Sequence, residues 1–485
     1  MKKITIAITL ITTVFALSAQ NEIDALRYSQ QDLFGNARFA AMSGAFGALG
    51  GEFSSLSYNP AGIGMYQSNE LTFTPSFSLN NTKSYSTLSS IDEYKMGIDI
   101  SNLGLVYCIQ KDNSEWKRIN IGLGWNQLAS YQRNVRIEAE NSSSSLADKI
   151  LELANGNNIN DLNRFHTSLA FWTDLIDLAD NSVDTVTNWY TNDNGNYISH
   201  IRGNSNKLQQ KVIRSNGSEN EFVFSAGGSY NENLYIGATV GLPRINYHEK
   251  STYTEDSFED TINGLQEFNY EEELSVYGSG VNLKLGAILR ISEQLKLGGA
   301  VHTPTLYSME ETYSTSLTTH FESERYAESS PYNYFKYDLI TPWKAIISAS
   351  AVLNKKIIIS ADYEVIDYTF SEMNSYDYSF DTENDAIKET YIKTENIRLG
   401  AEANIKPFIL RGGYSKYGSP LENKDFSRER FSFGLGLNNG AYFFDLAYIL
   451  SQSINEHKLY SDDYINPISL ANTNHNVIFT LGFRY

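Results

Sequence analysis

An apolar stripe at helical spacing is the feature of this 485-residue sequence best suited to bind a ligand. Spacings of three and four residues put these side chains on one face of a helix that begins near Asp161. A capping box at Ser145–Asp148 predicts a second helix just before it. Burying hydrocarbon gains ~0.8 kcal/mol per methylene, so we expect an apolar groove that captures ligands; the alternative is that the two helices only pack on each other. The stripe consists of Leu162, Phe165, Leu169, Trp172 and Ile176.

Five basic residues form a second candidate group, because the alternation of the predicted strands points their side chains inward. Arginine can hold a carboxylate through two hydrogen bonds, so this group is suited to an acidic ligand. The alternative is a polar network with the inward-facing acids Asp362, Glu364, Glu402 and Asp445. The basic residues are Arg136, Lys284, Arg290, Arg398 and Arg430.

Catalytic and metal-binding patterns are absent from the sequence. The seven histidines have no metal-ligand spacing, and Cys108 is the single cysteine. No spacing selects a serine–histidine–acid set. We therefore expect no catalytic residue, no metal and no cofactor. A formal net charge of −19 opposes binding to nucleic acid.

Residues 1–19 have the pattern of a secretory signal peptide. Lys2 and Lys3 precede an apolar run that ends near Leu17, and Ser18 and Ala19 are small. The apolar run is too short for a spanning helix, which argues against the alternative of a membrane anchor. We expect the mature chain to be exported.

The elements that would position both candidate groups are strands. Along Ile119–Tyr131 apolar residues alternate with asparagine, glycine and glutamine, which is typical of a strand with one apolar and one polar face. Similar runs recur as hairpins, of which the turn Asn438–Gly440 is the clearest. Counting the runs gives fourteen, an even number as bacterial barrels have. We predict an all-β fold, a 14-stranded antiparallel transmembrane β-barrel over residues 69–485; a soluble sandwich or β-helix is the alternative.

Short and long connections alternate along the predicted barrel. Short turns near residues 112, 232, 293, 355, 406 and 439 suit the periplasmic side, and the long segments suit the outside. Both termini would then be periplasmic. Phe483 and Tyr485 share the lipid-facing parity, so the chain end resembles the signal that the barrel-assembly machinery recognises. The long segments are 81–97, 134–219, 250–269, 309–331, 370–388, 415–429 and 452–474.

Residues 20–68 differ in composition from the strands. Seven glycines, many alanines and apolar residues such as Phe39 and Phe46 suit a compact plug, or hatch, inside the barrel. The sequence here, and at two places in the barrel, resembles the FadL/TodX family of outer-membrane channels. The matching segments are Gly35–Arg38, Met42–Ala48, the motif Asn59, Pro60 and Ala61, Arg398–Glu402, Leu410–Tyr414 and Thr480–Tyr485.

The resemblance implies passive uptake of long-chain fatty acids or aromatic hydrocarbons through a hatch-closed lumen in the bacterial outer membrane. It also implies an inner ligand site and a side opening at a kinked strand, although no pattern locates the kink. Partners would be the hydrophobic ligand, outer-membrane lipid and lipopolysaccharide, and the protein would be a monomer. The competing interpretations are a surface scaffold or secretion component that reuses the barrel, and a rim enzyme. The ligand itself is not readable.

Overall fold

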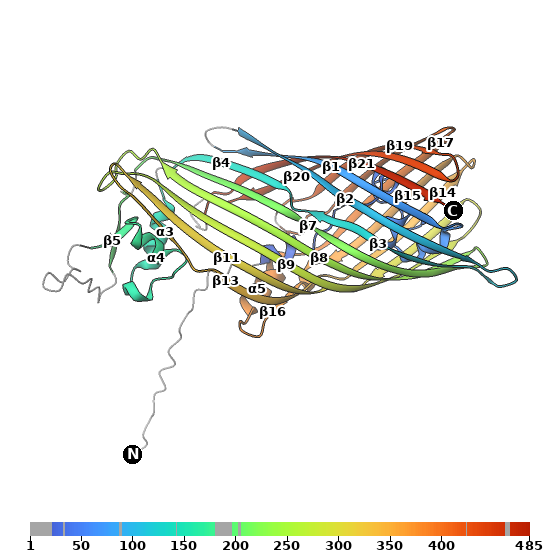
Figure 1. The fold of residues 1–485 in the computed structure, drawn as a ribbon, viewed down its shortest axis with the longest axis horizontal. Coiled ribbons are helices and arrows are strands. Elements are labelled where there is room, and N and C mark those ends of the chain that lie inside the picture. The colour runs from blue at the N-terminus through green and yellow to red at the C-terminus, as the bar shows by residue number, and fades with distance from the viewer. Residues whose placement is uncertain are drawn as a thin grey trace, which may run out of the picture.

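The protein is a tilted, closed β-barrel with its N-terminal segment inside (Figure 1). The computed structural model describes residues 22–485 except 33, 87–89, 142, 180–195, 202–204, 423 and 461–465. The barrel closes because β1 pairs with β2 on one side and with the last strand, β21, on the other. All pairings in the wall are antiparallel, and the predicted fourteen-stranded barrel is confirmed.

Nineteen hydrogen-bonded segments form the wall, and consecutive segments that continue one another reduce these to fourteen positions. In order they are β1 (Glu70–Tyr85), β2 (Ser90–Gln110), β3 (Trp116–Ser130) with β4 (Arg133–Asn141), β7 (Lys207–Tyr230), β8 (Leu234–Asp256), β9 (Leu265–Arg290), β10 (Leu295–His302) with β11 (Leu306–Phe321), β12 (Arg325–Ser329) with β13 (Asn333–Ile340) and β14 (Lys344–Leu353), β15 (Ile357–Asp367) with β16 (Glu372–Asn374), β17 (Lys393–Ile405), β18 (Phe408–Tyr417), β19 (Arg428–Asn438), β20 (Tyr442–His457) and β21 (Ile468–Arg484).

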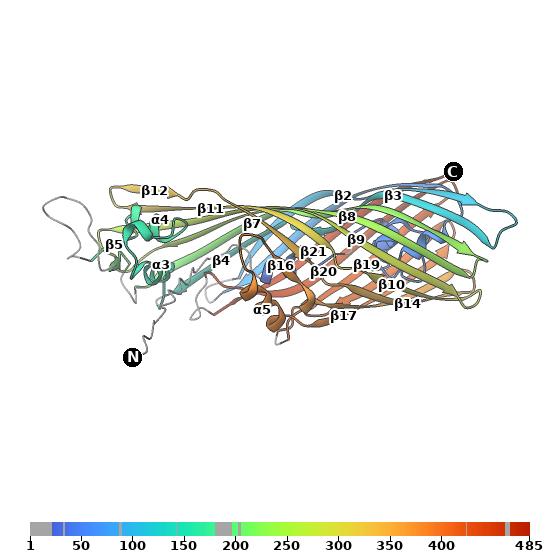
Figure 2. The same ribbon diagram turned by 90° about the horizontal axis from the view of Figure 1, so that it is seen from below.

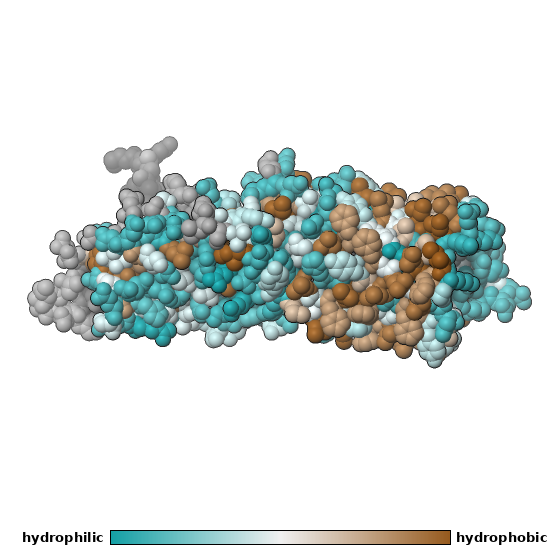
Figure 3. All heavy atoms as spheres, turned by 90° about the horizontal axis from the view of Figure 1, so that it is seen from above, coloured by the Kyte–Doolittle hydropathy of each residue, from teal (hydrophilic) through white to brown (hydrophobic). Residues whose placement is uncertain are grey.

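The two faces of the wall follow the alternation of the sequence. On β1, Leu71 and Phe73 face outward and are exposed, while Thr72 and Thr74 are buried toward the lumen. The outward apolar side chains gather over one half of the molecule (Figure 3). An apolar outer band around a polar interior is what a membrane-spanning barrel requires. No helix in the part of the chain that the structure describes could cross a membrane by its length and apolarity.

The strands extend well past this apolar band. Residues 134–141 and 207–219, expected within one extracellular loop, continue as strand in β4 and β7. The connection between β4 and β7 is therefore shorter than the predicted extracellular loop 134–219. Polar cross-strand pairs, such as Lys250 Nζ and Glu271 Oε2 at 3.0 Å, replace apolar residues there. The ladder therefore continues where the hydrophobic alternation has ended, and the alternation alone under-predicted the strand lengths.

Residues 22–68 lie inside the barrel, where Figure 2 shows their ribbon surrounded by strands. Their elements are short because glycine and serine interrupt them. Phe53 fills the space left by Gly104 and Gly124 on two neighbouring strands, so the hatch packs directly on the wall. The elements are α1 (Glu22–Arg27), α2 (Ala37–Ala41), η1 (Phe53–Ser57) and η2 (Pro60–Met65).

A small domain, which we call the cap, connects β4 to β7. It comprises α3 (Leu146–Ala154), η3 (Ile159–Asp161), α4 (Thr167–Trp172), β5 (Ile176–Leu178) and β6 (Tyr197–Ser199). The predicted capping box is present, because Ser145 and Asp148 satisfy each other's backbone N–H groups at the start of α3. The predicted second helix from Asp161 to Ile176 is wrong: only six residues are helical, since Asp174 takes a positive φ of 57° and the chain becomes a strand.

The two ends of the described chain lie at different levels of the barrel. Tyr485 lies at the end with the short turns, where its backbone pairs with Asn69. Glu22 lies inside, near the long connection that carries η4 (Tyr368–Phe370) and α5 (Asp381–Thr390), and its carbonyl accepts a hydrogen bond from Tyr391. Which end of the barrel faces the periplasm stays a prediction.

Candidate ligand path through the barrel

The motif Asn59, Pro60 and Ala61 fastens the hatch to the wall. The Asn59 side chain accepts a hydrogen bond from Ala61 N at 3.1 Å and donates to Gly47 O at 2.6 Å and Ala287 O at 3.3 Å. A side chain at Gly286 would collide with the Asn59 amide, at 1.9 Å from its oxygen. The motif therefore needs a glycine on β9, and its role in this structure is to hold two hatch loops and one strand together.

A chain of ion pairs anchors the other side of the hatch. Arg38 of α2 binds Glu402 on β17 at 2.8 Å, and Glu402 also binds Arg411 on β18 at 2.7 Å. Arg411 reaches Asp445 on β20 at 2.6 Å. Glu402, Arg411 and Asp445 are buried and Arg38 is partly exposed, so removing one of the arginines would leave a buried carboxylate with fewer partners. These ion pairs fasten α2 to β17, β18 and β20.

Four of the five predicted luminal bases are already paired with acids. The Lys284 ammonium, with 4% side-chain exposure, contacts Glu221, whose side chain is fully buried. Arg398 binds Glu364 at 3.0 Å, which confirms the polar network as the immediate environment of these groups. Arg290 is half-buried on β9 near the short-turn end. Arg430 pairs with Asp32. Arg136 pairs with Glu138 but does not have the luminal direction that the alternation gave it: Val135 and Ile137 face the interior core, so Arg136 lies on the opposite face of β4 with its side chain 43% exposed.

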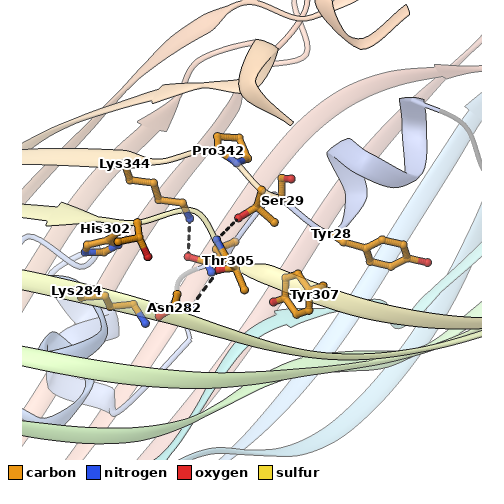
Figure 4. A pocket seen from close by; sticks show the side chains of 12 residues that line it. Tyr28, Ser29, Asn282, Lys284, His302, Thr305, Tyr307, Pro342 and Lys344 are labelled. Carbon is orange, nitrogen blue, oxygen red and sulfur yellow. Dashed lines mark hydrogen bonds between the residues drawn. The ribbon is translucent and has the colours of Figure 1, made fainter. Parts of the chain in front are cut away.

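A small polar pocket lies where the hatch meets β9, β10 and β14. Figure 4 shows Lys284, His302 and Lys344 on one side of it and Tyr28 on the other. The Lys344 ammonium donates to Gln31 at 2.7 Å, and among the described residues it has no carboxylate within 4 Å. Neighbouring strands break beside this pocket, because Pro304 and Pro342 remove two ladder donors at residues 303–305 and 341–343.

The wall has a boundary without a ladder, which we call the seam. β2 pairs with β3 only from Asn102 to Gln110, and β4 pairs only with β7, so residues 90–101 lack a strand partner on this side. The break between β3 and β4 at residues 131–132 turns β4 inward. Asn80 Nδ2 donates to Gln132 O at 2.6 Å, so β4 lies behind the β1–β2 hairpin.

The seam has an apolar outer face. Met96 and Ile98 on β2 are 79% and 75% exposed, among the most exposed apolar side chains of the wall. Three side-chain hydrogen bonds join the β1–β2 hairpin to β4 and the break before it: Asn134 Nδ2 to Tyr94 O at 2.9 Å, Asn80 Nδ2 to Gln132 O at 2.6 Å and Ser84 Oγ to Arg136 O at 2.7 Å. An unpaired backbone edge is costly in hydrocarbon. The seam is therefore held by side chains rather than by a backbone ladder.

Residues 28–32, the crossing segment, tie the seam to the far wall. Asp32 N donates to Leu128 O at 2.7 Å, at the bulge where β3 begins to turn inward. The Asp32 carboxylate accepts from Arg428 at 2.8 Å and from Arg430 on β19. A ligand that moved this segment would therefore act directly on the seam.

The stripe predicted to form the apolar groove is mostly enclosed. Leu162, Leu169 and Ile176 are buried in one hydrophobic core with residues of β4, β8, β9 and β11. The half-buried Phe165 ring lies 5.8 Å from the Tyr313 ring. Trp172 alone is exposed, at 54%. Burial also lowers the pKa of His166, in the same domain, to about 4. The cap as described here is a packed domain with one exposed aromatic residue.

Sequence reasoning did not identify Tyr28, Tyr131, Tyr247 and Lys344, which line the lumen between hatch and seam. The alternation placed Tyr131 on the apolar outer face with Ile119 and Leu123, whereas its ring packs on Tyr28 and Tyr247 inside the barrel, because the strand breaks at residues 131–132. A cluster of tyrosines at luminal parity was the available signal, although it is masked by the general abundance of 33 tyrosines.

Known proteins resemble this chain in structure but not measurably in sequence. No protein-family model and no curated protein matches the sequence. A FadL homologue of Pseudomonas aeruginosa superposes with a TM-score of 0.54 at 12% identity, over 94% of this chain and 99% of that one. The toluene transporter TodX of Pseudomonas putida gives 0.52 at 12% identity, over 94% and 99%. The toluene transporter TbuX of Ralstonia pickettii gives 0.51 at 13% identity, over 93% and 98%.

Proposed function

We propose, on the premise that this chain has the fold of the FadL and TodX channels, that it takes up hydrophobic molecules passively across the outer membrane. The observation that carries the proposal is the seam beside a closed hatch. In this proposal α2, η1 and η2, which lie inside the barrel, would block a straight path to the short-turn end, whereas residues 90–101 at the seam have no strand partner on that side. An apolar molecule would leave the lumen sideways into the lipid.

Sideways exit suits apolar cargo on physical grounds. A molecule that enters the bilayer through the seam never has to be solvated by the periplasm, and its burial is worth about 25 cal/mol per Å². The exposed Met96 and Ile98 would provide the lipid-side rim of this exit. No nucleotide-binding pattern is present in the sequence, so transport would follow the gradient of the cargo.

The cargo class follows from the luminal charges. Of the five predicted bases, Arg136, Lys284, Arg398 and Arg430 already contact acids. Releasing one of them for a fatty-acid carboxylate would leave its partner unpaired. The four paired bases therefore favour cargo without a carboxylate, and Lys344, which has no carboxylate within 4 Å among the described residues, is the pocket base left for an acidic head group. Capture of the cargo by the cap remains part of the proposal, with Trp172 as the exposed contact.

A cross-link at the seam tests the exit. In a Cys108→Ser background, the pair Asn80→Cys and Gln132→Cys joins β1 to the β3–β4 break, whose hydrogen bond spans the seam. After cross-linking, uptake of labelled toluene or hexadecane into proteoliposomes should fall several-fold and recover on reduction. Unchanged uptake in the cross-linked protein would contradict exit through the seam.

The matched control places the bond across strands that are already laddered. Thr82 faces Asn472 between β1 and β21, and their side chains are 3.2 Å apart. The pair Thr82→Cys and Asn472→Cys should leave uptake unchanged. A separate test addresses the scaffold or secretion alternative. Cells in which the gene for this protein is deleted should take up alkanes or aromatics more slowly than the parent strain. Uptake equal to that of the parent strain would favour the alternative.

A further inference from the structure

Three tyrosines form an aromatic box at the inner mouth of the seam. Tyr131 comes from the strand break, Tyr247 from β8 and Tyr28 from the crossing segment. Their ring centroids are 5.4 Å apart for Tyr131–Tyr247, and 6.1 Å apart for Tyr28 with either of the other two, all edge to face. Gly217 (φ +120°) lies opposite Tyr247 and binds Tyr131 N, so no side chain separates the two wall tyrosines.

The box already holds a cation of the protein itself. The Arg27 guanidinium lies 4.6 Å from the Tyr247 ring centroid and 5.9 Å from that of Tyr28. Faces of aromatic rings attract cations because of their quadrupole. Arg27 sits at the end of α1 and brings its own counter-ion, since it pairs with Asp24 three residues earlier. The internal cation therefore does not need a carboxylate from the wall.

Two wall carboxylates beside the box form no salt bridge among the described residues, although Lys344 lies near Glu219 and Arg133 near Glu249. Glu219 occupies the luminal position next to Gly217 on β7, and Glu249 the one next to Tyr247 on β8. Each accepts a tyrosine hydroxyl, from Tyr307 and Tyr247 respectively. Within the described ranges neither has a basic group within 4 Å, in contrast to the luminal acids Glu221, Glu364, Glu402 and Asp445. Two buried or half-buried acids without a salt bridge are unusual next to such a network.

We propose that this box binds the head group of an apolar cation, such as an alkyl quaternary ammonium or a protonated alkyl amine, with Arg27 occupying the site until such a ligand displaces it. The proposal rests on the proposed channel function and specifies one class of its cargo. The ammonium would lie against the Tyr131 and Tyr247 rings, balanced by Glu219 and Glu249, and the alkyl chain would point toward the seam.

The local charges favour a cation over an anion. The carboxylates of Glu219 and Glu249 lie near two wall bases, because Lys344 interacts electrostatically with Glu219 and Arg133 with Glu249. Asp24 and Arg27 of α1 cancel each other. The preference for a cation therefore comes from the tyrosine rings, whose negative faces attract an ammonium and repel a carboxylate, and from the two carboxylates beside them.

Three water-soluble probes of equal chain length test this proposal: octyltrimethylammonium, octanol and octanoate. Calorimetric titration of the full-length protein in maltoside should rank the ammonium first and the carboxylate last. Arg27→Ala removes the internal cation and should tighten binding of octyltrimethylammonium roughly 3- to 30-fold, the range expected for a cation over aromatic rings. Arg27→Lys, which keeps a positive charge, should bind it about as the wild type does.

The variant Glu219→Gln with Glu249→Gln separates charge from shape. It should weaken the ammonium at least tenfold and change octanol binding less than twofold, which also shows that the protein is folded. Equal affinity of the ammonium and octanol in both the wild type and Arg27→Ala would overturn the cation site, as would tighter binding of octanoate. If the cation site is overturned in this way, binding of octanol and uptake of toluene would still support the proposed channel function. Absence of binding for all three probes together with absence of toluene uptake would contradict the channel function as well.

Discussion

At the scale of single residues, buried polar contacts join the hatch to the wall beside small hydrophobic clusters such as that of Phe53, Leu56 and Ile63. Asn59 makes three hydrogen bonds in a fully enclosed position, and Arg411 links two acids on different strands. Such contacts fix geometry strongly because each leaves an unsatisfied group when its partner is removed. Asn59 and the ion pairs of Arg38 and Arg411 therefore help to fix the hatch against the wall.

Asn59→Ala should loosen the hatch without unfolding the barrel. The substitution leaves Gly47 O and Ala61 N without their partner, at a cost of about 1–3 kcal/mol for each buried group. Hydrogen exchange in residues 47–65 should accelerate tenfold or more, while β20 and β21 stay protected. Asn59→Asp retains the acceptor for Ala61 N but not the donors, and should give an intermediate effect. Equal protection in all three proteins would show that the motif does not hold the hatch.

At the scale of elements, the cap packs as one core with the wall strands at the end opposite the short turns. Its helices bury Leu162, Leu169 and Ile176 against the extended strands, and Glu255 on β8 accepts hydrogen bonds from Ser145 and Leu146 at the start of α3. α4 offers solvent one large side chain, Trp172. If the cap receives cargo, it does so first at this residue.

Trp172→Asp should lower uptake at limiting cargo concentration about threefold, within the energy of one aromatic contact, and leave the cap folded. Phe165→Asp should have a larger effect, because that ring also packs on Tyr313. Ile198→Asp, at another exposed apolar position of the cap, is the matched control and should not change uptake. Uptake rates at low toluene concentration report on capture of the cargo, and rates at saturating toluene report on its passage through the barrel. Identical uptake curves for Trp172→Asp and the wild type would show that the cap does not take part in uptake.

At the scale of the whole molecule, closure of the barrel depends on its last residues. Asn69 and Tyr485 exchange two backbone hydrogen bonds, and Arg484 binds Glu70 at 2.8 Å. The Phe483 ring lies 5.0 Å from Tyr442 and 5.5 Å from Tyr485, which forms an aromatic cluster at the short-turn rim. The first and last strands therefore meet at the point where the chain ends.

Deletion of Phe483–Tyr485 should prevent insertion, because it removes the first rungs of the closing ladder and the aromatic end. We expect the truncated chain to accumulate in the periplasm or to be degraded, as judged by membrane fractionation and by loss of heat-modifiable migration on gels. Tyr485→Phe keeps the aromatic ring and should insert normally. Normal insertion of the truncated chain would refute a role of this end in assembly.

The strands of the apolar band were predictable because membrane burial imposes a strict period of two. Above the band both faces are polar, so β7 and β9 run on through segments that the sequence marked as loops. The seam was not predictable, since it depends on the bulge near Leu128 and on the positive φ of Gly217 in another strand. The paired bases show the same limit: parity gives the direction of Arg398, but its contact with Glu364 depends on register between strands.

The excess length of the strands sets the height at which cargo is met. The 26 residues of β9, at about 3.4 Å each and a tilt of about 40°, reach roughly 65 Å along the barrel axis. The apolar band of such a barrel is about 25 Å tall, so the cap stands roughly 40 Å above the bilayer. With the cap outward, as predicted, capture at the cap would move the encounter from the lipid surface into the sugar layer expected to cover it. A poorly soluble molecule would then cross that layer inside the protein rather than through hydrated polysaccharide.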